Sequence, residues 1–114
     1  MDHETVQFLD KYIFPELHDL NTGFDVPAIR YFSKDDFEII LHRCAEFGVQ
    51  VLGIEPWPDG KFGGVKTYED YTDDPADFVW YRSAFEEFLA EGIISHFAAS
   101  YAVPKDVLRR HTSH

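Results

Sequence analysis

The sequence contains little cysteine, few basic residues and no long apolar run. Cys44 is the only cysteine in 114 residues, so no disulfide can form within the chain, as is typical of a reducing compartment. No stretch approaches the roughly 20 apolar residues that span a bilayer, and the N-terminal residues lack the basic and apolar regions of a signal peptide. We therefore expect a cytoplasmic protein that makes no contact with membranes.

Acidic side chains outnumber basic ones by two to one. Lysine and arginine total 10, against 21 aspartates and glutamates, for a formal net charge of −11. Nucleic acids and anionic membranes are polyanions, so this charge disfavours both as direct partners. It favours a basic protein as the partner, and a surface that serves only solubility is the alternative.

Apolar side chains are plentiful, with a hydrophobic fraction of 45% and an aromatic fraction of 17%. These fractions are too high for a disordered chain, and the length suits one domain with one aromatic-rich core. We predict a single domain over residues 1–114, with an N-terminal helical segment at 1–23 and a C-terminal tail at 104–114.

Apolar spacings of three and four predict helix over Glu4–Leu20. Pro15 removes an intrahelical donor, so we expect two short helical pieces with a break near Phe14. The segment Ala28–Phe32 is β-branched and aromatic, which indicates a strand.

The clearest helix follows Ser33, which precedes the acids of a first helical turn. Gly48 stands where a left-handed C-terminal residue is favoured. Between them the predicted core stripe consists of Phe37, Ile40, Leu41, Cys44 and Phe47.

Two strands, Val49–Ile54 and Lys61–Tyr68, are expected to form a hairpin around the turn at Pro56–Gly60. Asp74 and Pro75 are predicted to cap and begin the next helix, which Gly92 ends. The apolar stripe of that helix is Phe78, Tyr81, Phe85, Phe88 and Leu89.

The last strand is expected over Ile93–Val103, followed by a short helix over Lys105–Arg110. The core-facing side chains of this strand are predicted to be Ile93, Phe97, Ala99, Tyr101 and Val103.

The resulting order of elements predicts an α+β domain. It has an antiparallel sheet of three to four strands with two helices on one face, in the ferredoxin-like split βαβ order, plus the N-terminal helix. The fourth strand of this order is Ile29–Phe32, and without it the sheet has three strands and another topology.

No motif for catalysis, a metal or a cofactor is recognisable. The six histidines show no close pairing within an element, and a calcium loop's spacing is missing from the acidic run. Cys44 lies on an apolar stripe, which favours packing over reactivity. We therefore expect a protein that is not an enzyme and holds no cofactor.

Acidic and aromatic residues gather between Gly53 and Asp77. Local structure explains Asp59, Asp74 and Asp77 as turn or helix-start residues, and a core position at the hairpin tip is the alternative for Trp57. Trp and Tyr are enriched among interface hot spots, and acids speed association with a basic partner. The predicted partner-binding residues are Glu55, Trp57, Glu69, Asp70, Tyr71 and Asp73.

The small size, the acidity, the segment Gly53-Ile54-Glu55-Pro56-Trp57 after a helix–strand unit and the aromatic helix Trp80–Leu89 carry a resemblance. Over Tyr31–Val103 the chain resembles the small acidic immunity proteins of bacterial polymorphic and contact-dependent toxin systems. The resemblance implies a cytoplasmic inhibitor that binds a toxin's catalytic domain, often a nuclease, and has no catalytic residue of its own.

Two other functions are kept open. A ferredoxin-like module that binds a small molecule or regulates would need a deep apolar pocket with convergent polar groups. An enzyme would need a cleft that holds carboxylates or His96 with shifted titration. Homodimerisation through exposed strand edges is also left open.

Overall fold

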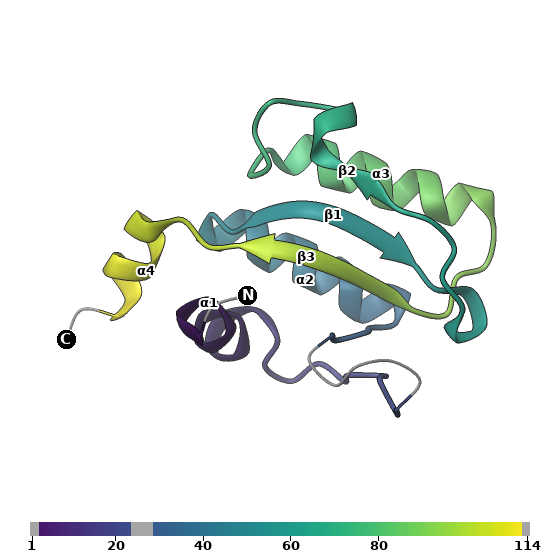
Figure 1. The fold of residues 1–114 in the computed structure, drawn as a ribbon, viewed down its shortest axis with the longest axis horizontal. Coiled ribbons are helices and arrows are strands. Elements are labelled where there is room, and N and C mark those ends of the chain that lie inside the picture. Colours follow the sequence, from purple (N-terminus) through teal and green to yellow (C-terminus); the bar gives the residue numbers. More distant parts are fainter. Residues whose placement is uncertain (1–2, 24–28, 113–114) are drawn as a thin grey trace.

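A computed structural model describes residues 3–23 and 29–112 (Figure 1). It confirms an α+β fold. The elements in chain order are α1 (His3–Phe8), the π-helical turn η1 (Leu9–Ile13), α2 (Lys34–Phe47), β1 (Gln50–Pro56), the 3₁₀ turn η2 (Pro58–Gly60), β2 (Lys66–Thr67), the 3₁₀ turn η3 (Tyr68–Asp70), α3 (Phe78–Glu91), β3 (Phe97–Ala102) and α4 (Lys105–Thr112).

The sheet of the described residues has three antiparallel strands in the order β2–β1–β3. Helices α2 and α3 both lie behind this sheet in Figure 1, as the helical stripes predict. The core between them is aromatic, because Phe97 of β3 stacks on Phe37 of α2 at 5.2 Å and meets Phe85 of α3 edge-on at 5.1 Å.

The ferredoxin-like strand order is not confirmed, because the strand expected before α2 is reduced to one bridge, between Phe32 and Phe97. Tyr31, the residue before this bridge, forms its backbone hydrogen bonds outside the sheet. The Tyr31 amide donates to the Asp19 carboxylate and the Tyr31 carbonyl accepts from the Leu20 amide, so they pair with the preceding loop. Ala28, where the predicted strand begins, lies outside the described residues.

The helix α2 has the predicted boundaries and caps. Ser33 accepts from the Asp36 amide through its side chain, and Gly48 has the left-handed φ of 77°. Four of its five predicted core residues are fully buried and Phe47 is half-buried.

The prediction of a second helical piece after Pro15 is wrong. The N-terminal helix changes to a π-helical turn and ends at Phe14, whose amide donates to the Leu9 carbonyl. Beyond it the chain makes a turn, in which Glu16 has a left-handed φ of 72°, and the guanidinium of Arg43 donates to the carbonyls of Ile13 and Pro15. A long-range bond from α2 therefore satisfies carbonyls that a helix would have used.

Both later strands are shorter than predicted. The strand expected over Lys61–Tyr68 is only β2, because Gly64 has a left-handed φ of 121° and the Gly63 amide bonds back to the Pro56 carbonyl. The last strand starts at Phe97, and Ile93, expected in the core, is 98% exposed.

The start of α3 also differs from the prediction. Asp77, not Asp74, is the N-cap, and its carboxylate accepts from the Val79 amide at 2.9 Å. Asp74 closes the preceding turn instead by accepting from the Ala76 amide. That turn presents the Pro75 carbonyl to the Val51 amide, which places the loop against β1.

The predicted short C-terminal helix is confirmed as α4, which packs against the N-terminal segment. His111 contributes its ring to an aromatic cluster with Phe8, Tyr12 and Phe47, at centroid distances of 5.1 to 5.5 Å. The two ends of the described chain thus stabilise each other.

Candidate functional site

The six residues predicted to bind a partner fall into two groups along β1. Glu55 and Trp57 lie where β1 ends, and the other four lie on the loop between β2 and α3, which is bonded to Val51 near the start of β1. A strand rises about 3.3 Å per residue, so the groups are about 15–20 Å apart along β1.

Trp57 is half-buried and held in place from several sides. Its indole nitrogen donates to the Glu55 carboxylate at 3.2 Å, and its ring packs edge-on against Tyr31 and Phe62. Its amide donates to the carbonyl of His96, the residue just before β3. The ring is therefore neither a core side chain nor a free one, and its orientation is determined by the fold.

The second group lies on the turn η3 and on the loop that follows it. Glu69, Asp70 and Asp73 are exposed and take part in no ion pair or side-chain hydrogen bond with the described residues. Tyr71, in contrast, is half-buried, and its ring packs on Trp80 at 5.4 Å. Three carboxylates thus project from a turn that one aromatic ring fastens to α3.

Tyr71 also joins a small polar network on α3. Its hydroxyl donates to Glu87, and the same carboxylate oxygen accepts from the Lys66 ammonium at 3.1 Å. The hydrogen bonds from Tyr71 and Lys66 lower the pKa of Glu87. Burial and the bond to Glu87 raise the pKa of Tyr71, so the hydroxyl stays protonated and keeps donating.

Exposed apolar side chains lie between the two groups. Phe62 is 56% exposed and Val65 is 53% exposed, in the segment that leads into the edge strand β2. Phe62 touches Trp57, so an aromatic pair stands at one end of this edge and the carboxylates at the other. We call the segment Phe62–Asp73 the acidic edge.

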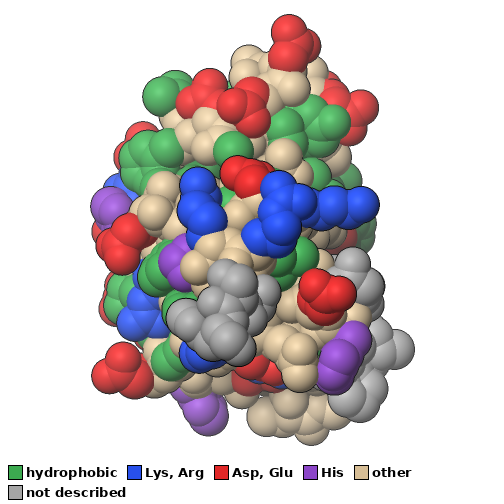
Figure 2. All heavy atoms as spheres, turned by 90° about the vertical axis from the view of Figure 1, so that its left-hand side faces the viewer, with side chains coloured by type: hydrophobic (Ala, Val, Ile, Leu, Met, Phe, Trp, Pro, Cys, Tyr) green, Lys and Arg blue, Asp and Glu red, His purple; other side chains and the backbone are tan. Residues whose placement is uncertain are grey.

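Charge is unevenly distributed over the molecule. Figure 2, which views the molecule from the α4 side, shows acidic side chains at the top, over the loop that follows β2, and a basic band across the middle. Arg109 and Arg110 in the last turn of α4 belong to the basic residues of this side. A basic partner would accordingly be attracted to the acidic edge and repelled by α4.

Catalytic and metal sites find little support in the described part of the chain. No group of three or more His, Cys, Asp or Glu side chains is placed to hold a metal ion there. Cys44 is buried, and burial raises its thiol pKa, which disfavours the reactive thiolate. Ser95 and His96 lie within hydrogen-bonding distance, but the Ser95 hydroxyl accepts from the Asp59 amide and so fastens the hairpin tip.

No described helix has the length and apolar character needed to cross a bilayer.

The sequence pattern did not identify three residues of this site, namely Lys66, Glu87 and Phe62. Lys66 and Glu87 are 21 positions apart and meet only because β2 and α3 are neighbours in space. The pattern predicts a strand at Phe62, but the structure leaves this residue outside the strands, exposed and packed on Trp57. The Gly63-Gly64 pair was the one signal in the sequence that the strand would be interrupted near Phe62.

A scan of protein-family models, a search of curated proteins and a search of solved structures each found nothing that matches this chain.

Proposed function

We propose that this chain is a non-enzymatic immunity protein that binds and neutralises a basic bacterial toxin domain, with nucleases as one class of target. The observation that carries the proposal is the acidic edge, where Glu69, Asp70 and Asp73 are exposed and unpaired on an ordered turn. The resemblance to small acidic immunity proteins agrees with this reading.

The turn is built so that its carboxylates need little ordering on binding. Tyr71 anchors it through the Trp80 ring and the Glu87 carboxylate, and Lys66 joins the same carboxylate from β2. A surface that is already ordered loses less conformational entropy when a partner docks. Unpaired carboxylates on such a surface speed encounter with a basic partner and set its orientation.

Phe62, at the apolar end of the acidic edge, and the neighbouring Trp57 supply an apolar contact that carboxylates alone do not. Trp57 and Phe62 pack together at 5.6 Å and are both accessible. Accessible aromatic rings held in one orientation are the usual anchors of protein interfaces, and polar groups surround them. We therefore assign affinity to the aromatic pair and association rate to the carboxylates.

The direct test is capture of the product of the adjacent upstream gene, followed by a toxicity assay. We expect a stable complex, and we expect co-expression to rescue cells from that product. The proposal fails if the neighbouring gene encodes no toxic protein and the chain rescues cells from none.

The role of the acidic edge is tested by reversing its charges. Glu69→Lys, Asp70→Lys and Asp73→Lys together should lower the association rate about tenfold at low salt and flatten its salt dependence. The control has the same change in net charge on the N-terminal segment and α2: Glu4→Lys, Glu16→Lys and Glu46→Lys. Equal losses in both triple variants would show that net charge alone attracts the partner.

A further inference from the structure

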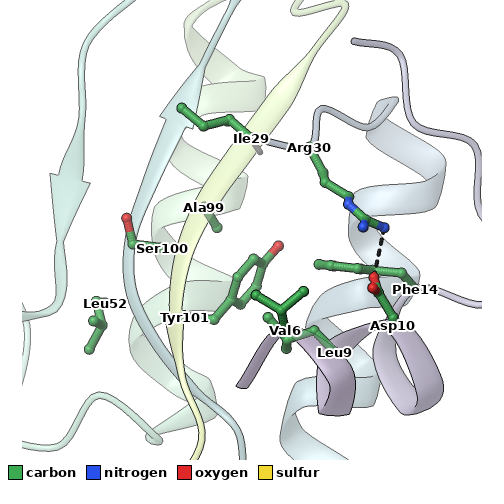
Figure 3. Close-up of a pocket in the computed structure, with 10 residues that line it drawn as sticks. All are labelled: Val6, Leu9, Asp10, Phe14, Ile29, Arg30, Leu52, Ala99, Ser100 and Tyr101. Carbon is green, nitrogen blue, oxygen red and sulfur yellow. Dashed lines mark ion pairs between the residues drawn. The ribbon is translucent and has the colours of Figure 1, made fainter. Parts of the chain in front are cut away.

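A cavity of about 390 Å³ lies between β3 and the N-terminal segment. Figure 3 shows Val6, Leu9 and Asp10 on one side, Leu52 and Ser100 on the other, and Tyr101 between them. Phe14, Ile29, Arg30 and Ala99 complete the lining. The volume is within the range of about 300–1,000 Å³ that small-molecule sites occupy. None of the residues that line the cavity belongs to the acidic edge, and nothing in the proposed function uses it.

The wall on the N-terminal side depends on the π-helical turn. The i→i+5 bond from the Phe14 amide to the Leu9 carbonyl, at 2.9 Å, brings both side chains to the cavity. Such turns inside helices are rare and occur often at functional sites. Leu9 and Phe14 are at most 8% exposed, so this wall is apolar and well packed.

Tyr101 is the main polar group that faces the cavity. It is 7% exposed, and its hydroxyl makes no hydrogen bond to the described residues. Burial raises its pKa well above the ordinary tyrosine value, so the hydroxyl stays protonated and can donate. Because this hydroxyl makes no hydrogen bond within the described fold, it is available to donate to an acceptor atom of a ligand in the cavity.

Among the lining residues that the structure describes, the two charged side chains already neutralise each other. The Arg30 guanidinium lies 2.7 Å from the Asp10 carboxylate and stacks over the Phe14 ring at 5.4 Å. An anionic ligand would have to displace Asp10, and it would be repelled by the net charge of −11. A cationic ligand would have to displace Arg30. The lining therefore selects an uncharged molecule.

We propose that this cavity is a binding site for a small, neutral, largely apolar molecule of one or two rings whose carbonyl-type acceptor bonds to the Tyr101 hydroxyl. The Val6, Leu9, Phe14 and Leu52 side chains enclose its rings, and Ser100, which is exposed, lies at the mouth.

The test uses prodan, a neutral naphthyl ketone whose fluorescence reports the polarity around its carbonyl. We expect saturable binding at one site per chain, with weaker binding of the anionic naphthalene sulfonate dye ANS. Tyr101→Phe should raise the prodan Kd about fivefold to tenfold, because it removes one hydrogen bond and little volume.

Tyr81→Phe is the matched control. Its hydroxyl likewise makes no hydrogen bond to the described residues, but Tyr81 does not line the cavity, so this variant should bind prodan like the parent chain. Ala99→Leu, which fills the cavity, should abolish binding, with thermal unfolding as the check that it folds. Absence of saturable binding, equal Kd values for the two tyrosine variants, or tighter binding of ANS would each overturn the proposal.

Discussion

The hydroxyl of Tyr71 donates to the Glu87 carboxylate at 2.5 Å, which joins the loop after β2 to the outer face of α3. The same carboxylate oxygen receives the Lys66 ammonium. The Glu87 carboxylate thus holds the acidic edge in position through its hydrogen bonds with Tyr71 and Lys66. Glu87 serves the fold, whereas Glu69, Asp70 and Asp73 form no ion pair with the described residues.

The first prediction concerns the titration of this network. Tyr71→Phe should raise the pKa of Glu87 toward its ordinary value, because the Tyr71 hydrogen bond is the largest cause of its depression. Carboxyl chemical shifts followed by NMR across acidic pH measure this directly. Tyr68→Phe in the same turn is the control, since the Tyr68 hydroxyl makes no hydrogen bond to the described residues. An unchanged Glu87 titration in the Tyr71 variant would contradict the assignment.

The pH dependence of the network follows from the same shifts. The lowered pKa of Glu87 gives stabilisation that is present above the ordinary glutamate pKa and lost as pH falls through the lowered one. The raised pKa values of Tyr71 and Lys66 give stabilisation that is present below their ordinary values and lost as pH rises through the raised ones. Hydrogen exchange of the η3 amides should accordingly be slowest, after correction for intrinsic rates, between these limits.

The start of α3 gives a second prediction. Asp77→Ala should lower the free energy of unfolding by about 1 kcal/mol, because it removes the N-cap bond to the Val79 amide. Asp74→Ala should cost about 0.5 kcal/mol or less, since it removes only a turn bond to the Ala76 amide. Urea unfolding of the two variants gives both values. A larger loss of unfolding free energy in the Asp74 variant would indicate that Asp74 is the N-cap, as the sequence alone predicts.

The sequence predicted those elements whose signals are local. Ser33 and Gly48 flank the fourteen residues of α2, and the core stripe between them can be predicted from the spacing of those residues alone. The same logic failed at Pro15, where Arg43 from α2 takes the free carbonyls. It also failed at Ile93, where an apolar residue next to a strand is left in solvent.

The candidate sites needed tertiary structure for a different reason. Glu69, Asp70 and Asp73 could be singled out because folding gave them no local role, whereas the role of Glu87 depends on Tyr71 lying above it. The cavity brings Leu9 and Tyr101 together across 92 positions in the chain (101 minus 9), and no periodic pattern carries that information.

The hairpin tip gives a third prediction. A β-carbon on Gly63 would lie 2.9 Å from Cδ of Pro58, so that something must shift, and at a tight 3.0 Å from the Pro56 carbonyl oxygen. Gly63→Ala should therefore lower the free energy of unfolding by about 1–3 kcal/mol. Gly92→Ala, at a nearly extended position with nothing within 4 Å, should be neutral or slightly stabilising. Equal thermal unfolding midpoints for both variants would show that the tip relaxes without cost.

Cys44 gives the last prediction, because burial both hides the thiol and raises its pKa. The native protein at mildly alkaline pH should react with DTNB far more slowly than a free thiol, at a rate limited by opening of the core around α2. The control moves the thiol to the surface in a Cys44→Ala, Ile93→Cys variant, since Ile93 is 98% exposed. That variant should react at the rate of a free thiol, and the parent chain should approach it only in denaturant. Fast, complete labelling of the native parent would place Cys44 at an accessible site and reopen a reactive role for it.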